Sequence, residues 1–237
     1  MRGIAVSLVL YAIPIIVAIW VIVALCKRYK ETKLKDILAL IVFFVGITID
    51  NIGIFVYYAL VLLNRYPYEF IGSQARLDMT GVAIAWIAAS LFAMRILWYE
   101  KKSWRVIPPI LGATYAIGAW IVPYEVLENA DKWCRFHDEL VYLSFGTLLP
   151  LMILPVICFA FYSIGALNRV EKVKGEMLSL GFAMLAFTLI FELHGMHAFL
   201  LPLFHFFITV SFVILYIGFT TPPWFFKRIR EKQEEKR

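Results

Sequence analysis

Charged residues are scarce in this sequence of 237 residues: Asp, Glu, Lys and Arg together make up only 17% of it. Soluble domains average about 25%. Hydrophobic residues make up 62%, well above the roughly 45–50% of a soluble chain. The shortage of charge therefore excludes an ordinary soluble domain. It predicts a multi-pass protein of the cell membrane, with the lipid bilayer as its first partner.

Cysteine and histidine are also rare, with three and four copies. The cysteines Cys26, Cys134 and Cys158 fall in different parts of the chain, which argues against a disulfide framework. Only one histidine, His205, lies deep in an apolar run, which argues against a haem held by two facing histidines. The run 198–219 has no lysine that could hold retinal. HExxH, GxSxG and P-loop patterns are missing too, so no catalytic residue and no enzymatic activity are predicted.

Long hydrophobic runs are what the sequence has in abundance. An α-helix needs roughly 20 apolar residues to cross a hydrocarbon core of about 30 Å. Seven runs of about this length are present, at 3–26, 37–63, 79–98, 106–122, 139–165, 175–193 and 198–219. They predict an all-α polytopic bundle of seven transmembrane helices, forming one domain over residues 1–226, with a short basic cytoplasmic tail at 227–237. The first run is too long for a signal peptide and ends without a cleavage site, so we expect it to stay in the mature chain.

The distribution of basic residues predicts the orientation of these helices. Lys and Arg near helix ends are retained on the cytoplasmic side. If the helices alternate in direction, 18 of the 23 Lys and Arg residues fall on one side. The N-terminus is therefore expected outside and the C-terminus inside. A basic inner surface facing anionic lipid accounts for the net charge of +6, so no nucleic-acid partner is predicted.

Polar residues inside the apolar runs are the first candidates for a site, because ionisable groups in hydrocarbon are costly. Asp50 lies 14 residues beyond Asp36, about 21 Å into the second helix. Asn51 beside it points about 100° away and can bond to a different neighbouring helix. Candidate partners of Asp50 are Ser90, His205 and Thr209. A structural clasp between helices and a proton- or ion-linked role both remain open.

The outer loops hold a second group of candidates. Two short pairs combine a thiol and imidazoles that zinc or copper would accept: Cys134 with His137, and His194 with His197. An i, i+3 spacing places both members of a pair on one side of a turn. Acidic residues stand nearby, at Asp131, Asp138 and Glu192. A zinc or copper site, a polar ligand rim and simple hydrated loops are the three interpretations left open.

The C-terminal third supports one resemblance. The last helix closes with "YIGFTTPPWFFKRIREK", and with the seven-span topology this ending resembles the N-terminal sensory module of archaeal and bacterial membrane histidine kinases. The residues that carry the resemblance are Gly218, Pro222, Pro223, Trp224, Lys227, Arg228 and Arg230. Such kinases continue into a cytoplasmic output domain beyond this point. The resemblance thus implies a sensory module that docks to a separate signalling protein.

Three hypotheses of function follow. The leading one is a receptor or sensor that binds a small ligand or ion from the outer side, at Asp50, Asn51, His205 and Glu192, and signals to a cytoplasmic partner. The second is a metal- or proton-linked transporter, or an intramembrane metalloenzyme, using the same polar residues. The third is a structural subunit of a membrane complex. The sequence leaves the oligomeric state open.

Overall fold

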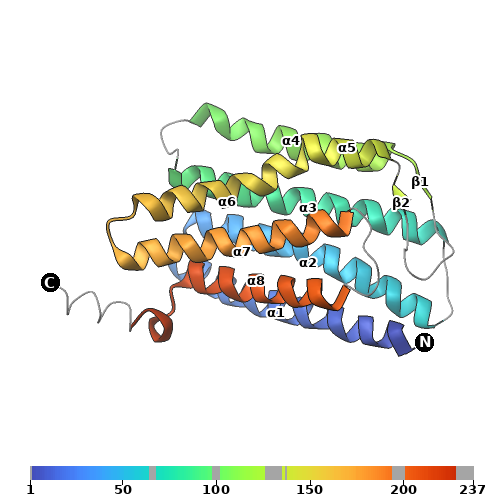
Figure 1. Ribbon diagram of the computed structural model, residues 1–237, viewed down its shortest axis with the longest axis horizontal. Helices are drawn as coiled ribbons and strands as arrows, with labels where there is room; N and C mark the ends of the chain where they lie inside the picture. Colours follow the sequence, from blue (N-terminus) through green and yellow to red (C-terminus); the bar gives the residue numbers. More distant parts are fainter. Residues whose placement is uncertain are drawn as a thin grey trace.

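The chain folds as a bundle of long helices in a computed structural model that describes residues 2–63, 68–97, 102–125, 135–136, 138–193 and 201–227 (Figure 1). Its helices are α1 (Arg2–Thr32), α2 (Lys35–Leu62), α3 (Tyr68–Leu97), the 3₁₀ turn η1 (Lys102–Val106), α4 (Ile107–Ile121), α5 (Asp138–Gly146), α6 (Leu148–Gly165), α7 (Arg169–Leu193) and α8 (Leu201–Thr220). Between α4 and α5, the short strands β1 (Tyr124–Glu125) and β2 (Arg135–Phe136) pair antiparallel.

Six helical segments are long and apolar enough to cross a membrane. They are Leu8–Thr32, Lys35–Val56, Gly72–Leu97, Asp138–Gly165, Arg169–Phe191 and Leu203–Thr220, the fourth of which joins α5 and α6. The prediction of a helical membrane protein is therefore confirmed. The predicted run 106–122 forms only the 15 residues of α4, about 22 Å of helix. Prolines bound it, because Pro108 and Pro109 occupy its first turn and Pro123 follows its end.

If α5 and α6 are counted as one helical segment, consecutive helical segments lie antiparallel and side by side (Figure 1). The chain closes on itself because α8 packs against α1 as well as α7, and α3 also packs against α6. Figure 1 shows that α1 begins at one end of the bundle and α8 finishes at the other. The end that carries the connections α2 to α1 and α6 to α7 holds the basic residues of segments 27–36 and 168–174. We call it the basic end.

Helices α2 and α3 approach each other unusually closely. A Cβ added to Gly46 would lie 2.5 Å from the carbonyl oxygen of Gly81, and one added to Gly81 would lie 2.9 Å from the carbonyl oxygen of Gly46. Membrane helices associate through such packing of small residues, since lipid offers no hydrophobic drive. This contact fixes the two helices against each other one turn away from Asp50.

Aromatic rings fill the bundle on the basic side of Asp50. Phe43 contacts Trp86 at 5.8 Å and Phe182 at 5.3 Å between ring centroids, and Phe159 stacks on Phe182 at 5.7 Å. Edge-to-face and offset pairs of this kind add about 0.5–1.5 kcal/mol each beyond the burial of their surface. Between Asp50 and the basic end, the interior of the bundle is therefore tightly packed and apolar.

Candidate functional site

Three of the four predicted ligand residues are buried inside the bundle. Asp50 is 5% exposed, Asn51 2% and His205 1%. Glu192 lies near the end of α7, and its side chain falls outside the described part of the structure. The predicted depth of Asp50 is consistent with the fold, because α2 begins at Lys35 and carries Asp36 in its first turn.

The predicted metal ligands Cys134, His137, His194 and His197 lie outside the described residues, as does Asp131. Asp138 begins α5 and is exposed. Among the residues that the structure does describe, no group of three or more His, Cys, Asp or Glu side chains could hold a metal ion. Zinc or copper binding at the outer rim accordingly stays a prediction from the sequence.

Asp78 is a buried carboxylate that the sequence analysis missed. It lies just before the predicted run 79–98, but α3 begins ten residues before Asp78, at Tyr68. The side chain of Asp78 is fully buried, at 0% exposure. The pattern that could have found it is the spacing of Gln74, Asp78 and Gly81, which places all three on one face of a helix.

Asp78 faces α2 directly beside Asp50. Its Oδ1 accepts a hydrogen bond of 2.7 Å from Nε2 of Gln74, one turn away on α3. A Cβ placed on Gly53 of α2 would collide with both carboxylate oxygens of Asp78. Gly53 is three residues from Asp50 and so shares its face of α2. The two carboxylates lie close enough to interact electrostatically.

The helix register agrees with this placement. Arg95 of α3 pairs with Asp36 of α2 at 3.2 Å, at the basic end. Seventeen residues separate Asp36 from Gly53, and seventeen separate Arg95 from Asp78. Gly53 and Asp78 thus meet about 26 Å from the ion pair, which places them, with Asp50 one turn nearer to it, in the half of the bundle away from the basic end.

Two carboxylates buried close together are unstable as a pair of negative charges. Charges in a low-dielectric interior are strongly disfavoured unless they are paired, and like charges in proximity oppose each other's ionisation. Tyr115 of α4, fully buried, also lies within the electrostatic influence of Asp50. Its hydroxyl contacts the sulfur of Met79 at 3.0 Å. The pair is therefore suited to holding a proton or a cation between α2, α3 and α4.

Among the described residues, neither Asp50 nor Asn51 makes a side-chain hydrogen bond to a neighbouring helix. Asn51 donates from Nδ2 to the carbonyl oxygen of Ile47 in its own helix, at 2.8 Å. Ser90 donates to the carbonyl of Leu151 in α6, and Thr209 donates to the carbonyl of His205. Asn51 and Thr209 follow the tendency of polar side chains in helices to bond to a backbone carbonyl one turn away, whereas Ser90 bonds to another helix. These residues leave the Asp50 carboxylate to other partners.

His205 belongs to α8 and packs against α1. Its ring makes an edge-to-face contact with Tyr11 of α1, with 3.6 Å between centroids. Neither ring nitrogen has a hydrogen-bond partner among the described residues. Phe44 of α2 contacts Phe212 of α8. His205 precedes Phe212 by seven residues, and Asn51 follows Phe44 by seven residues. Because α2 and α8 run in opposite directions, His205 and Asn51 lie at the same level of the bundle.

These residues form a single stratum of polar side chains across the bundle, drawn from α2, α3, α4 and α8. We call it the polar layer, and it comprises Asp50, Asn51, Gln74, Asp78, Tyr115 and His205. Buried polar atoms without partners are rare in proteins and call for an explanation such as an ion or a water molecule. The polar layer is thus the candidate functional site.

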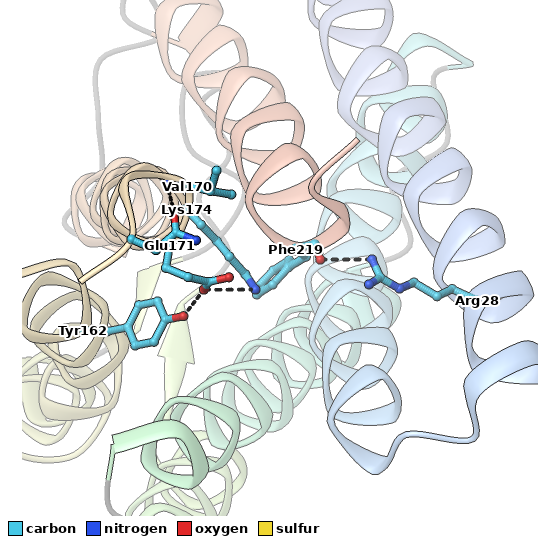
Figure 2. A network of polar contacts seen from close by, with 7 residues as sticks. Arg28, Tyr162, Val170, Glu171, Lys174 and Phe219 are labelled. Carbon is cyan, nitrogen blue, oxygen red and sulfur yellow. Dashed lines mark hydrogen bonds and ion pairs between the residues drawn. The ribbon is translucent and has the colours of Figure 1, made fainter. Parts of the chain in front are cut away.

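A second polar network lies at the basic end (Figure 2). Arg28 of α1 donates from Nη1 to the carbonyl oxygen of Phe219 near the end of α8, at 3.1 Å. Tyr162 of α6 donates to Oε2 of Glu171 in α7, and Nζ of Lys174 lies 3.7 Å from the same oxygen. Arg28 satisfies a carbonyl of the last turn of α8, where helices leave such groups without partners.

The chain leaves α8 by a sharp change of direction. Thr221 adopts a left-handed conformation with φ 44°, which is uncommon for a β-branched residue. Pro222 follows and a helical turn covers 223–227. Phe226 is buried at 0% exposure while Trp224 is 70% exposed. The exit therefore folds back on the bundle and leaves Trp224 free to contact a membrane surface.

A comparison with models of known protein families finds no match for this chain, and a comparison with curated proteins finds none either.

Proposed function

We propose that this protein is a seven-helix membrane receptor or sensor, oriented with its N-terminus outside and its C-terminus inside. The proposal takes a small ligand or ion into the polar layer from the outer side. Its occupancy shifts the packing of α1 and α8, and a cytoplasmic signalling protein reads that shift at the basic end.

The seven-span topology is supported by the path of the chain. Six segments have spanning length, and α4 runs alongside α3 with the same alternation of direction (Figure 1). The beginning of α1 and the end of α8 lie at opposite ends of the bundle, which favours an odd number of crossings. Counting α4 gives seven. The basic end then faces the cytoplasm, as the retention of Lys and Arg on that side favours.

The observation that carries the sensor proposal is the contact seam between α1 and α8. Tyr11 packs on His205 in the polar layer, and Arg28 bonds to the carbonyl of Phe219 at the basic end. Both helices run in the same direction. A ligand that repositions His205 therefore acts on the same pair of helices whose other ends lead into the cytoplasm.

Such coupling requires differential affinity. A ligand shifts a two-state equilibrium only by the difference between its affinities for the two states. The His205 ring, whose nitrogens have no partner among the described residues, gains hydrogen bonds in any state that presents a donor or acceptor to it. That gain is the energetic source of the proposed shift.

The test combines binding with a distance measurement. Spin labels at Lys30, in the last turn of α1, and Trp224, after α8, both exposed, are placed in a background without native cysteines, in lipid nanodiscs. Ligands and metal ions that raise the melting temperature are added, and the distance between labels is measured by pulsed electron resonance. We expect a shift that the variant His205→Ala loses. Binding with an unchanged distance distribution in the parent protein contradicts the sensor role.

A second candidate function is favoured by one specific observation, the pairing of Asp50 with Asp78. Carboxylates inside membrane spans often serve as proton or cation relays, so a cation-linked carrier remains in competition with the sensor. In proteoliposomes, a carrier would move sodium or protons down an imposed gradient, and Asp50→Asn would abolish the flux. A sensor would show no flux above empty liposomes.

A further inference from the structure

The carboxylate of Asp78 has an unmet need for a partner. Its Oδ1 is bonded to Gln74, whereas its Oδ2 is buried and has no hydrogen-bond partner among the described residues. The whole side chain has 0% exposure. A buried carboxylate oxygen in this state loses its hydration without compensation, and such an atom is best explained by an ion or water at the site.

The Asp78 carboxylate fits between α2 and α3 because the residue that faces it on α2 is a glycine. A Cβ at Gly53 would occupy the position of the Asp78 oxygens. The same face of α2 carries Asp50 one turn away, and its charge acts on Asp78. No described residue makes a hydrogen bond or ion pair to the Asp50 carboxylate. Two sets of carboxylate oxygens thus converge on the α2–α3 interface.

The chemistry of these donors selects the class of ligand. Carboxylate oxygens suit hard cations rather than zinc or copper, which favour nitrogen and sulfur. Ca²⁺ takes six to eight oxygens and Mg²⁺ gives up its water reluctantly, whereas this buried interface offers two carboxylates, and the Gln74 amide turns its nitrogen toward Asp78. One monovalent cation together with one proton neutralises both carboxylates, so neither like-charge repulsion nor unpaired buried charge remains.

We infer that Asp50 and Asp78 form a sodium site between α2 and α3, in which Na⁺ contacts both carboxylates and one proton is retained on the pair. The inference rests on the proposed function in that it names an ion for the same polar layer. It does not depend on how the signal reaches the cytoplasm.

Binding of radioactive ²²Na⁺ to the purified protein in nanodiscs tests the inference, with choline chloride holding the ionic strength constant. We expect saturable binding that unlabelled Na⁺ displaces and choline does not. Loss of an outer-shell partner alone lowers metal affinity by about 10–100-fold, so Asp50→Asn and Asp78→Asn should each weaken binding by about tenfold or more.

The matched control is Asp36→Asn, the same change on the same helix, at a half-exposed acid whose partner is Arg95. Its sodium affinity should equal that of the parent. The asparagine variants remove a buried charge and keep the side-chain shape, so they are expected to fold, which the melting temperature and the elution profile will verify.

Three results would overturn the inference: absence of saturable binding to the folded parent protein, unchanged affinity in Asp78→Asn, or displacement by Ca²⁺ at lower concentration than by Na⁺. The outcomes also separate the two proposals. Sodium binding without any change in the Lys30–Trp224 distance keeps the site and rejects the sensor. A distance change caused by another ligand, without sodium binding, does the reverse.

Discussion

At the scale of single residues, the close packing of Asp78 against Gly53 is the central contact of the site. A glycine in the middle of a membrane helix is ordinarily a device for close packing of backbones. Here the space left by the missing side chain is filled by a carboxylate from the neighbouring helix. The identity of residue 53 therefore controls whether a polar group can be buried at the α2–α3 interface.

Replacing Gly53 by alanine should destabilise the protein by about 1–3 kcal/mol, the usual cost of overpacking a tight site. The measurement is the free energy of unfolding in mixed micelles. Most of the loss should disappear in the double variant Gly53→Ala/Asp78→Ala, because the colliding carboxylate is then gone, and so is the hydrogen bond that holds Nε2 of Gln74 within 2.2 Å of the added Cβ. Gly165→Ala is the control, since nothing lies within 4 Å of a Cβ there. Equal losses with and without Asp78 would show that the collision is absent.

Arg28 offers a second prediction at this scale. Arg28→Ala removes the hydrogen bond to the carbonyl of Phe219 and should cost about 1.5 kcal/mol, the lower end for bonds to charged groups, because the contact is only partly buried. Unfolding of the purified protein measures it. The neighbouring exposed Lys27→Ala should have little effect. A loss as large for Lys27 as for Arg28 would indicate a general effect of charge at the basic end.

At the scale of helices, composition and periodicity predicted most elements well. The predicted run 37–63 corresponds to α2 at Lys35–Leu62, because an apolar run of that length has few other folds available in a membrane. The start of α3 was missed by about ten residues. Polar residues such as Gln74 and Asp78 look like loop residues until the face opposite them is known.

Partners of buried side chains could be predicted less well than helices. The depth of Asp50 follows from its distance along α2, but its neighbour Asp78 follows only from the register between α2 and α3, which the glycines set. The partner of Asn51 was equally hard to predict, because its amide can bond either to the Ile47 carbonyl in its own helix or to a group on another helix. Local sequence carries no information about which of these wins.

The α2–α3 contact gives a prediction for the element scale. Gly46→Ala brings a methyl group to 2.5 Å from the carbonyl oxygen of Gly81, so the helices must separate. We expect a loss of about 1–3 kcal/mol in the free energy of unfolding and weaker sodium binding, since the carboxylates move apart. Gly146→Ala, where no atom lies within 4 Å, should leave sodium affinity unchanged. Unaltered stability in Gly46→Ala would mean that the helices are not in contact at this point.

At the scale of the whole molecule, α4 decides the topology. Its 15 residues reach about 22 Å, less than the roughly 30 Å of a hydrocarbon core. The prolines around it keep it short, and η1 precedes it. If α4 crosses, the chain spans the membrane seven times and the ends of α4 face opposite compartments.

Single cysteines in a background without native cysteines test this arrangement. Leu63→Cys and Pro123→Cys should react with a membrane-impermeant maleimide in intact cells, because the proposed topology places both outside. Ser103→Cys and Asn168→Cys, all four positions being exposed, should react only after permeabilisation. Labelling of Ser103→Cys and Pro123→Cys from the same side would show that α4 does not cross.

The parallel contact between α1 and α8 has a consequence for how the protein is made. Arg28 and its partner Phe219 are 191 residues apart in the chain, so at about 5–20 residues per second the ribosome needs roughly 10–40 s to deliver the second after the first. During that interval α1 is anchored through α2 alone, and its Tyr11 and Trp20 faces meet lipid instead of α8. The contact between α1 and α8, on which signalling is proposed to depend, therefore forms last during biosynthesis.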